Sequence, residues 1–141
     1  MDYRALAENL IGLRALLYRM PAIRKLSALE RGTFSALNYL AAHREGVHPK
    51  ELSEKMGISS ARVAALLNHM EREGLAARTT DPGDHRQILV LVTEAGERLN
   101  RDRTEEAVDI MARAFEELGP EEAEAFLRIN RKLVQYFMRQ T

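Results

Sequence analysis

The feature that most constrains the fold is the order of the short segments between Pro49 and Thr93. Pro49 suits the first position of a helix, and Gly57 can adopt the left-handed conformation that ends it. A second helix is expected to begin after about two or three residues and to end at Gly74. A β-hairpin follows at once, and this order within about 45 residues predicts a winged helix-turn-helix.

The hairpin is predicted from β-branched residues on both sides of a turn sequence. Residues 76–80 form its first strand, Asp81-Pro82-Gly83-Asp84 its turn, and residues 87–92 its second strand. Thr93 suits the N-cap of a long helix that continues to about Leu118. A last helix is expected after the Gly-Pro break that follows.

The segment before Pro49 is predicted to hold two helices. Apolar residues recur every three or four positions in residues 2–20, and Pro21 is expected to end that helix. Ser27 and Glu30 have the spacing of a capping box, which predicts a second helix that continues to Gly46. The expected fold is therefore mainly α, with about six helices and a two-stranded β wing.

The composition of the chain excludes several classes of protein. It has 141 residues and no cysteine, which excludes a disulfide framework and any cysteine-based zinc site. No apolar run approaches the roughly 18 residues of a membrane span, and the first residues do not have the order of a secretory signal. We therefore expect one domain in the cytoplasm, with no membrane partner.

Motifs of catalysis are missing from the sequence. The four histidines show no HExxH pairing, and the chain has neither a glycine-rich phosphate loop nor a GxSxG sequence. We expect no catalytic residues, no metal and no cofactor. A small enzyme remains as an alternative, together with a winged helix that binds protein instead of nucleic acid.

The second helix of the helix-turn-helix has a face suited to DNA. With Val63, Leu66, Leu67 and Met70 buried, the residues predicted to point outward are Ala61, Arg62, Ala64, Ala65, Asn68, His69 and Arg72. Arg62 can read guanine and Asn68 can read adenine or bind phosphate, while the small alanines permit close approach to the base edges. Ser59 and Ser60 suit a phosphate at the helix start.

The alternative for this helix is an ordinary solvated face. Such a face normally carries glutamate and lysine, whereas no acid lies between Ser59 and Glu71. This gap favours a polyanion as partner.

The wing has a candidate residue for the minor groove. Asp84 and Arg86 are two apart beside the turn, so the carboxylate can orient the guanidinium for a narrow, negative groove. The alternative is a local ion pair of the turn, which would contribute under about 1 kcal/mol. Arg78 and His85 are further candidates for phosphate contacts.

These motifs resemble those of the MarR family (multiple antibiotic resistance regulator) over nearly the full length of the chain. The residues that carry the resemblance are the run Glu51-Leu52-Ser53-Glu54-Lys55-Met56-Gly57-Ile58-Ser59, then Val63, Leu66-Leu67, Met70-Glu71 and Gly74-Leu75, then Asp81-Pro82-Gly83-Asp84-His85-Arg86 and Val90-Leu91-Val92-Thr93-Glu94-Ala95-Gly96. The resemblance implies a homodimer on a pseudopalindromic operator, which usually represses nearby genes and is often released by a small, frequently aromatic or phenolic ligand. Four positions carry residues that differ from those common in the family: Arg62, Ala65, Asn68 and His69. The base contacts of the family are therefore not carried over to this chain.

The resemblance also divides the single domain by role. Residues 1–26 and 94–141 are expected to form the dimer and residues 27–93 the DNA-binding lobe. The predicted dimer contacts are Leu6, Leu10, Leu13, Leu17, Phe126, Leu133 and Phe137, although these could also complete a monomeric core. The predicted ligand contacts are Tyr18, Met20, Phe34, Tyr39 and His43, which could equally be plain core residues.

Overall fold

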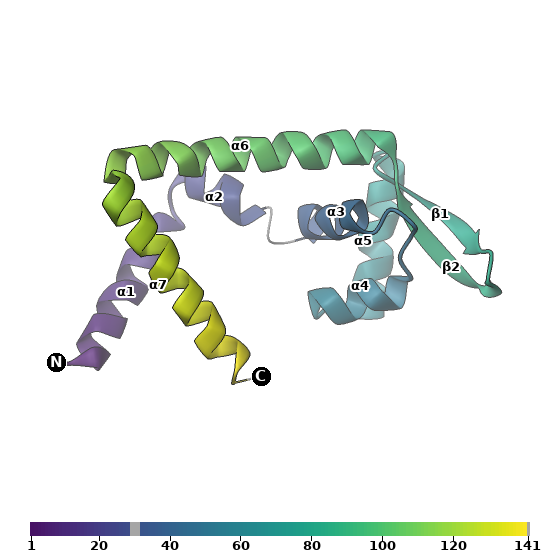
Figure 1. The fold of residues 1–141 in the computed structure, drawn as a ribbon. Coiled ribbons are helices and arrows are strands. Elements are labelled where there is room, and N and C mark those ends of the chain that lie inside the picture. Colours follow the sequence, from purple (N-terminus) through teal and green to yellow (C-terminus); the bar gives the residue numbers. More distant parts are fainter. Residues whose placement is uncertain (29–31, 141) are drawn as a thin grey trace. The chain divides into compact units, whose positions relative to one another are not determined.

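The computed structural model describes residues 1–28 and 32–140. Within these residues it contains seven helices and one antiparallel pair of strands (Figure 1). In chain order the elements are α1 (Tyr3–Leu17), α2 (Pro21–Ala28), α3 (Gly32–Ala42), α4 (Pro49–Met56), α5 (Ser60–Arg72), β1 (Ala76–Asp81), β2 (Asp84–Val92), α6 (Glu94–Leu118) and α7 (Pro120–Met138). The predicted class is confirmed, but the number of helices was one too low.

The additional helix is α2, which begins at the residue that was expected to stop α1. Pro21 occupies the first helical position, where its missing N–H costs nothing because that group has no partner inside a helix. The carbonyl of Met20 accepts the Arg24 N–H at 3.0 Å, which closes the first turn. A proline can therefore begin a helix as readily as it ends one.

The predicted capping box does not begin α3. Ser27 lies inside α2, where its hydroxyl donates to the carbonyl oxygen of Ile23 at 2.8 Å. Glu30, the other half of the box, lies outside the described residues. The Ser27 hydroxyl thus bonds back into its own helix, a common alternative for serine.

The hydrophobic core lies entirely in the lobe formed by α3, α4, α5 and the hairpin. Its buried members are Ala36, Leu37, Leu40, Val47, Leu52, Val63, Leu67, Met70, Leu75, Ala76 and Val90. By contrast, no described residue of α1 or α7 is buried. The lobe accordingly has a core of its own, and the terminal helices do not contribute to it.

The hairpin projects from this lobe (Figure 1). Its strands pair in register from Ala76 opposite Val92 to Asp81 opposite Asp84, with an irregularity between Thr80 and Asp81. The strands extend further than predicted and leave only residues 82–83 between them. Val47 forms an isolated antiparallel bridge on the other side of β2. Its N–H donates to the carbonyl of Val90 at 2.9 Å, and its carbonyl accepts the Val90 N–H at 2.8 Å.

A compact junction connects the end of the hairpin to α6. The Thr93 hydroxyl donates to the carbonyl of Gly74 at 2.6 Å and accepts the Gly96 N–H at 3.0 Å. The Thr93 N–H donates to the carbonyl of Leu75 at 3.1 Å. Gly96 is buried directly against that carbonyl. Thr93 is therefore the predicted N-cap of α6, and it also fixes the segment that follows α5.

By its internal contacts the chain forms two compact units, residues 1–104 and residues 105–141. The second unit contains the end of α6 and all of α7, with the rings of Phe115 and Phe126 5.9 Å apart. Among the described residues, none of the helices has both the length and the apolar character needed to cross a bilayer.

Candidate DNA interface

The N-terminus of α5 is fixed by Ser59, whose hydroxyl accepts the Arg62 N–H at 3.2 Å. Val63, Leu67 and Met70 are buried, as the periodicity predicts, and Leu66 is half-buried. The residues predicted to face outward are all exposed: Ala61, Arg62, Ala64, Ala65, Asn68, His69 and Arg72. Ser59 and Ser60 are exposed as well.

The exposed face of α5 has the chemistry of a surface for nucleic acid. The polar side chains on it are hydrogen-bond donors or neutral, and residues 59–70 include no acid. Guanidinium and amide groups can donate to base edges, and hydroxyls with backbone N–H groups at a helix start suit a phosphate. The other exposed residues of this face are three alanines, whose short side chains permit close approach of the helix to a partner.

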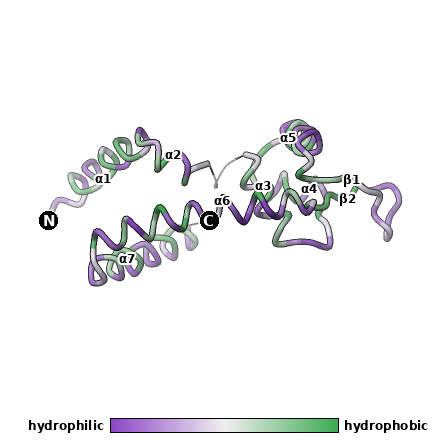
Figure 2. Tube along the Cα trace, turned by 90° about the horizontal axis from the view of Figure 1, so that it is seen from above, coloured by the Kyte–Doolittle hydropathy of each residue, from purple (hydrophilic) through white to green (hydrophobic). Residues whose placement is uncertain are grey.

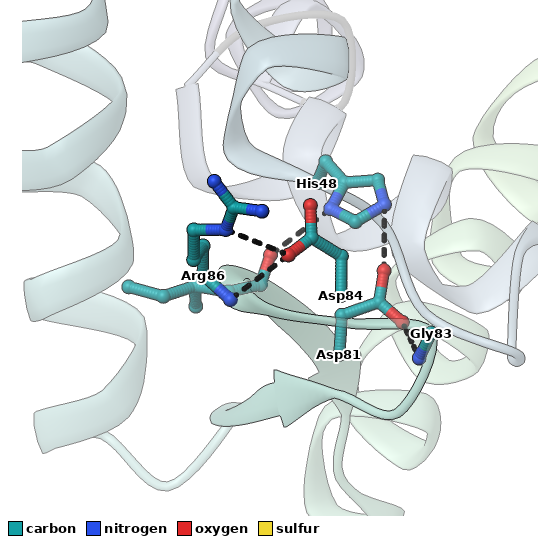
Figure 3. Close-up of polar contacts among 6 residues, drawn as sticks. His48, Asp81, Gly83, Asp84 and Arg86 are labelled. Carbon is teal, nitrogen blue, oxygen red and sulfur yellow. Dashed lines mark hydrogen bonds and ion pairs between the residues drawn. The ribbon is translucent and has the colours of Figure 1, made fainter.

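Asp84 and Arg86 are in contact on the wing (Figure 3). One oxygen of the Asp84 carboxylate accepts the Arg86 backbone N–H at 3.1 Å and lies 3.8 Å from the Arg86 Nε. The Arg86 side chain is 96% exposed. The result is an accessible guanidinium beside an acidic partner from its own turn, which suits a narrow groove.

The base of the wing contains a contact that sequence reasoning missed. The ring of His48 lies between Asp81, 3.1 Å from its Nε2, and the carbonyl of Ile88, 3.2 Å from its Nδ1. The second oxygen of Asp81 accepts the Gly83 N–H at 2.8 Å and so shapes the turn. The role of Asp81 in the turn could be predicted, because an aspartate before a Pro-Gly pair is typical of a turn. The contacts of His48 could not be predicted, because no sequence pattern near His48 indicates residues so distant along the chain.

Arg78, predicted as a phosphate contact, is engaged within the protein. Its guanidinium donates to the carbonyl of Ala64 at 3.3 Å and lies 3.7 Å from the Glu71 carboxylate. These contacts attach β1 to α5 and leave the side chain 28% exposed. His85, by contrast, is exposed on the wing. A phosphate contact by Arg78 stays a prediction. Such a contact would compete with the contacts of Arg78 to Ala64 and Glu71.

Two of the predicted ligand residues lie together. The rings of Tyr39 and His43 stack with centroids 4.2 Å apart, and the Tyr39 hydroxyl donates to Glu51 at 3.3 Å. Burial, followed by the nearby Glu51 carboxylate, raises the pKa of Tyr39. Its hydroxyl is therefore a stable donor at neutral pH that attaches α3 to α4.

The other three predicted ligand residues are dispersed. Phe34 packs against the core and lies under the Arg103 guanidinium, 5.7 Å from the ring centroid. Tyr18 lines a hollow of about 200 Å³ between α1 and α2, together with Arg14. Met20 is exposed. The five residues thus do not line a single cavity in the described chain.

The predicted dimer residues are all exposed. Their exposed fractions run from 44% at Leu133 to 62% at Phe137. Hydrophobic and hydrophilic residues alternate along both α1 and α7 in Figure 2. Each terminal helix thus presents apolar side chains at helical spacing that its own unit leaves accessible.

The comparison with known sequences points to one family. A model described as "MarR family" matches residues 29–87. The uncharacterized HTH-type transcriptional regulator YwhA of Bacillus subtilis is 29% identical over 86 residues, which are 61% of this chain and 62% of YwhA. The matched part therefore spans less than two thirds of that relative.

Solved structures resemble the chain over nearly its whole length. A MarR family protein from Bacillus stearothermophilus is 29% identical with a TM-score of 0.76, and the match covers 98% of this chain and 99% of that one. Streptococcus pneumoniae FabT, solved in complex with DNA, has a TM-score of 0.71 at 18% identity and matches over 99% and 100% of the two chains. The second likeness supports the fold alone. YwhA is described as a transcriptional regulator, and the Bacillus stearothermophilus protein as a MarR family protein.

Proposed function

We propose, from the premise that this chain belongs to the MarR family of DNA-binding transcription regulators, that it acts as a homodimeric repressor of nearby genes. The observation that carries the proposal is the exposed surface of residues 59–70, which includes no acid, beside a wing whose Arg86 is 96% exposed and paired with Asp84. Such a protein would act in the cytoplasm, together with the DNA that it binds.

In this proposal α5 enters the major groove and the wing reaches the adjacent minor groove. Arg62 in the first turn of α5 and Asn68 two turns further along read base edges, with His69 beside Asn68. Ser59, Ser60 and Arg72 contact phosphates at the two ends of the helix. Arg86 enters the minor groove, where negative potential is greatest in narrow A·T-rich segments.

The proposed function is tested by selecting fragments of genomic DNA that the full chain binds, followed by sequencing. We expect enrichment of a pseudopalindromic site near the protein's own gene. The logarithm of its affinity should fall linearly with the logarithm of salt concentration, by about 0.9 for each phosphate contact. Without an enriched site, or with a flat salt response, the alternative of a winged helix that binds protein would be favoured.

The dimer proposal assigns the interface to residues 1–26 and 94–141, and it rests on α1 and α7, whose described residues include none that is buried. Packing them against a second copy would remove this surface from water and place two recognition helices on one operator. The lobe of residues 27–93 then contacts the DNA.

Replacing Leu133 by lysine should shift the protein from dimer to monomer in sedimentation at micromolar concentration, because a charge would be buried in the interface. Gln135→Lys places the same charge about 200° away around α7 and should stay dimeric. A wild-type monomer at that concentration, or a dimeric Leu133→Lys variant, contradicts the proposed interface.

The proposed effector is a small aromatic acid. The hollow beside Tyr18 supports this class, because its apolar wall carries Arg14, whose guanidinium donates to the Tyr18 hydroxyl at 3.4 Å. A carboxylate could replace that hydroxyl as the partner of the guanidinium. The selected operator provides the assay, since benzoate-like acids should lower its affinity, and Arg14→Gln should abolish the effect.

A further inference from the structure

His48 holds the wing by two contacts that come from its two ring nitrogens (Figure 3). It is the N-cap residue of α4, but its side chain makes no capping bond to that helix. The ring instead reaches Asp81 at the end of β1 and the carbonyl of Ile88 on β2, at 3.1 and 3.2 Å. One side chain thus connects the start of α4 to both strands of the wing.

Both partners of the ring are hydrogen-bond acceptors. A neutral imidazole carries one N–H and can satisfy only one of them, whereas the protonated ring carries two. The Asp81 carboxylate cannot supply a donor when ionised, and its other oxygen already accepts the Gly83 N–H at 2.8 Å. The complete set of contacts therefore requires the protonated form of His48.

The charged groups around the ring come from five segments of the chain: α4, β1, β2, the loop before His48, and α6. His48 lines a hollow of about 500 Å³, and the charged residues that share it are Lys50, Glu51 and Glu54 from α4 and Arg86 from β2. Asp81 comes from β1, and Asp84 on β2 pairs with Arg86. On the loop before His48, Arg44 pairs with Glu97 and Glu45 is exposed. Of these groups Asp81 is the one in contact with the ring.

We propose that His48 is a positioning residue that holds the wing in its DNA-binding orientation when protonated and releases one strand when neutral. The proposal rests on the proposed DNA-binding function. The complete contact needs a proton on both ring nitrogens, so a higher pH that removes one of them breaks one of the two contacts. Operator affinity should therefore decrease as pH rises, because the wing that carries Arg86 becomes less constrained.

Asp81→Asn offers a sharp test, because it changes which form of the ring is satisfied. The amide oxygen of asparagine can still accept the Gly83 N–H, while its NH₂ can donate to a neutral His48 Nε2. The Nδ1–H of that neutral ring then donates to Ile88. The contact in the variant no longer needs the additional proton, and its pH dependence should disappear.

The first readout needs no DNA: hydrogen exchange of residues 81–88 in the full chain, corrected for the intrinsic effect of pH. Between about pH 5.5 and pH 8, wild-type protection should fall about threefold more than protection in Asp81→Asn, as expected for a partly exposed ionic contact. His85→Gln, which alters an exposed histidine of the same wing, should behave as the wild type. Equal profiles for wild type and Asp81→Asn overturn the proposal.

The second readout is affinity for the selected operator over the same pH range. Wild-type affinity should fall about threefold more than that of Asp81→Asn. Both proteins keep His69 and His85, so protonation of those residues cancels in the comparison. Parallel affinity profiles despite different exchange would overturn the link to DNA. Different exchange without any specific DNA binding would show that the proposed function has failed while the contact itself is present.

Discussion

Replacing Gly96 by alanine is expected to lower the free energy of unfolding by about 3 kcal/mol, a large effect for one methyl group. A Cβ at this position would overlap the carbonyl oxygen of Leu75, and it would lie 2.9 Å from the Val92 Cγ2 and 3.1 Å from the Leu75 carbonyl carbon. The first of these neighbours is backbone, and the Thr93 N–H holds it in place. The junction must therefore open before the methyl group fits.

Urea unfolding of wild type and Gly96→Ala measures this loss. Gly83→Ala is the matched control, because a Cβ there would meet only Asp81 Oδ1 at an ordinary 3.4 Å. The control should stay within about 0.5 kcal/mol of wild type. If Gly96→Ala were as stable as the control, the close packing between α6 and the segment after α5 would be contradicted.

Arg86→Ala is expected to weaken operator binding by about 1–3 kcal/mol, or about five- to 150-fold, without lowering the unfolding temperature. The side chain is 96% exposed, so its removal leaves no cavity. It does remove the one guanidinium that the wing turn orients through Asp84. Titration of labelled operator and a thermal melt measure the two effects separately.

Arg101→Ala provides the control for charge, since it removes an exposed arginine from α6. It should reduce affinity far less than Arg86→Ala does at the same salt concentration, because it lies outside the proposed interface. Asp84→Asn should be intermediate, as the guanidinium would remain but lose its ionic partner. Unchanged affinity in Arg86→Ala would count against the role of the wing.

The elements closest to the proposed interface could be predicted because their signals are local. Pro49 and Gly57 bound α4, Ser59 caps α5, and the turn sequence defines the hairpin. The periodicity of α5 was enough to separate its buried face from its exposed one. At Pro21 the local signal was ambiguous, because proline is compatible with both the end of one helix and the start of the next.

The contacts missed from the sequence are those between distant segments. His48 meets Ile88 across 40 positions, and Arg78 meets Ala64 across 14. Such pairings follow from how the lobe packs and have no periodic signature. The same reason explains why the predicted ligand residues do not lie together. Helical spacing could place Tyr39 beside His43, one turn apart, but it could not show that Tyr18 and Phe34 lie elsewhere in the fold.

Because all buried residues of α3–β2 lie in one lobe while α1 and α7 have none, the two parts of the molecule depend differently on concentration. A lobe with its own core should keep its structure in a single chain, whereas in the proposed dimer α1 and α7 would gain much of their stability from the second copy. By mass action, the fraction of ordered terminal helices then rises with the number of copies in the cell. If the proposed dimer is the form that binds the operator, operator occupancy would rise more steeply with the concentration of the chain than it would for a monomer.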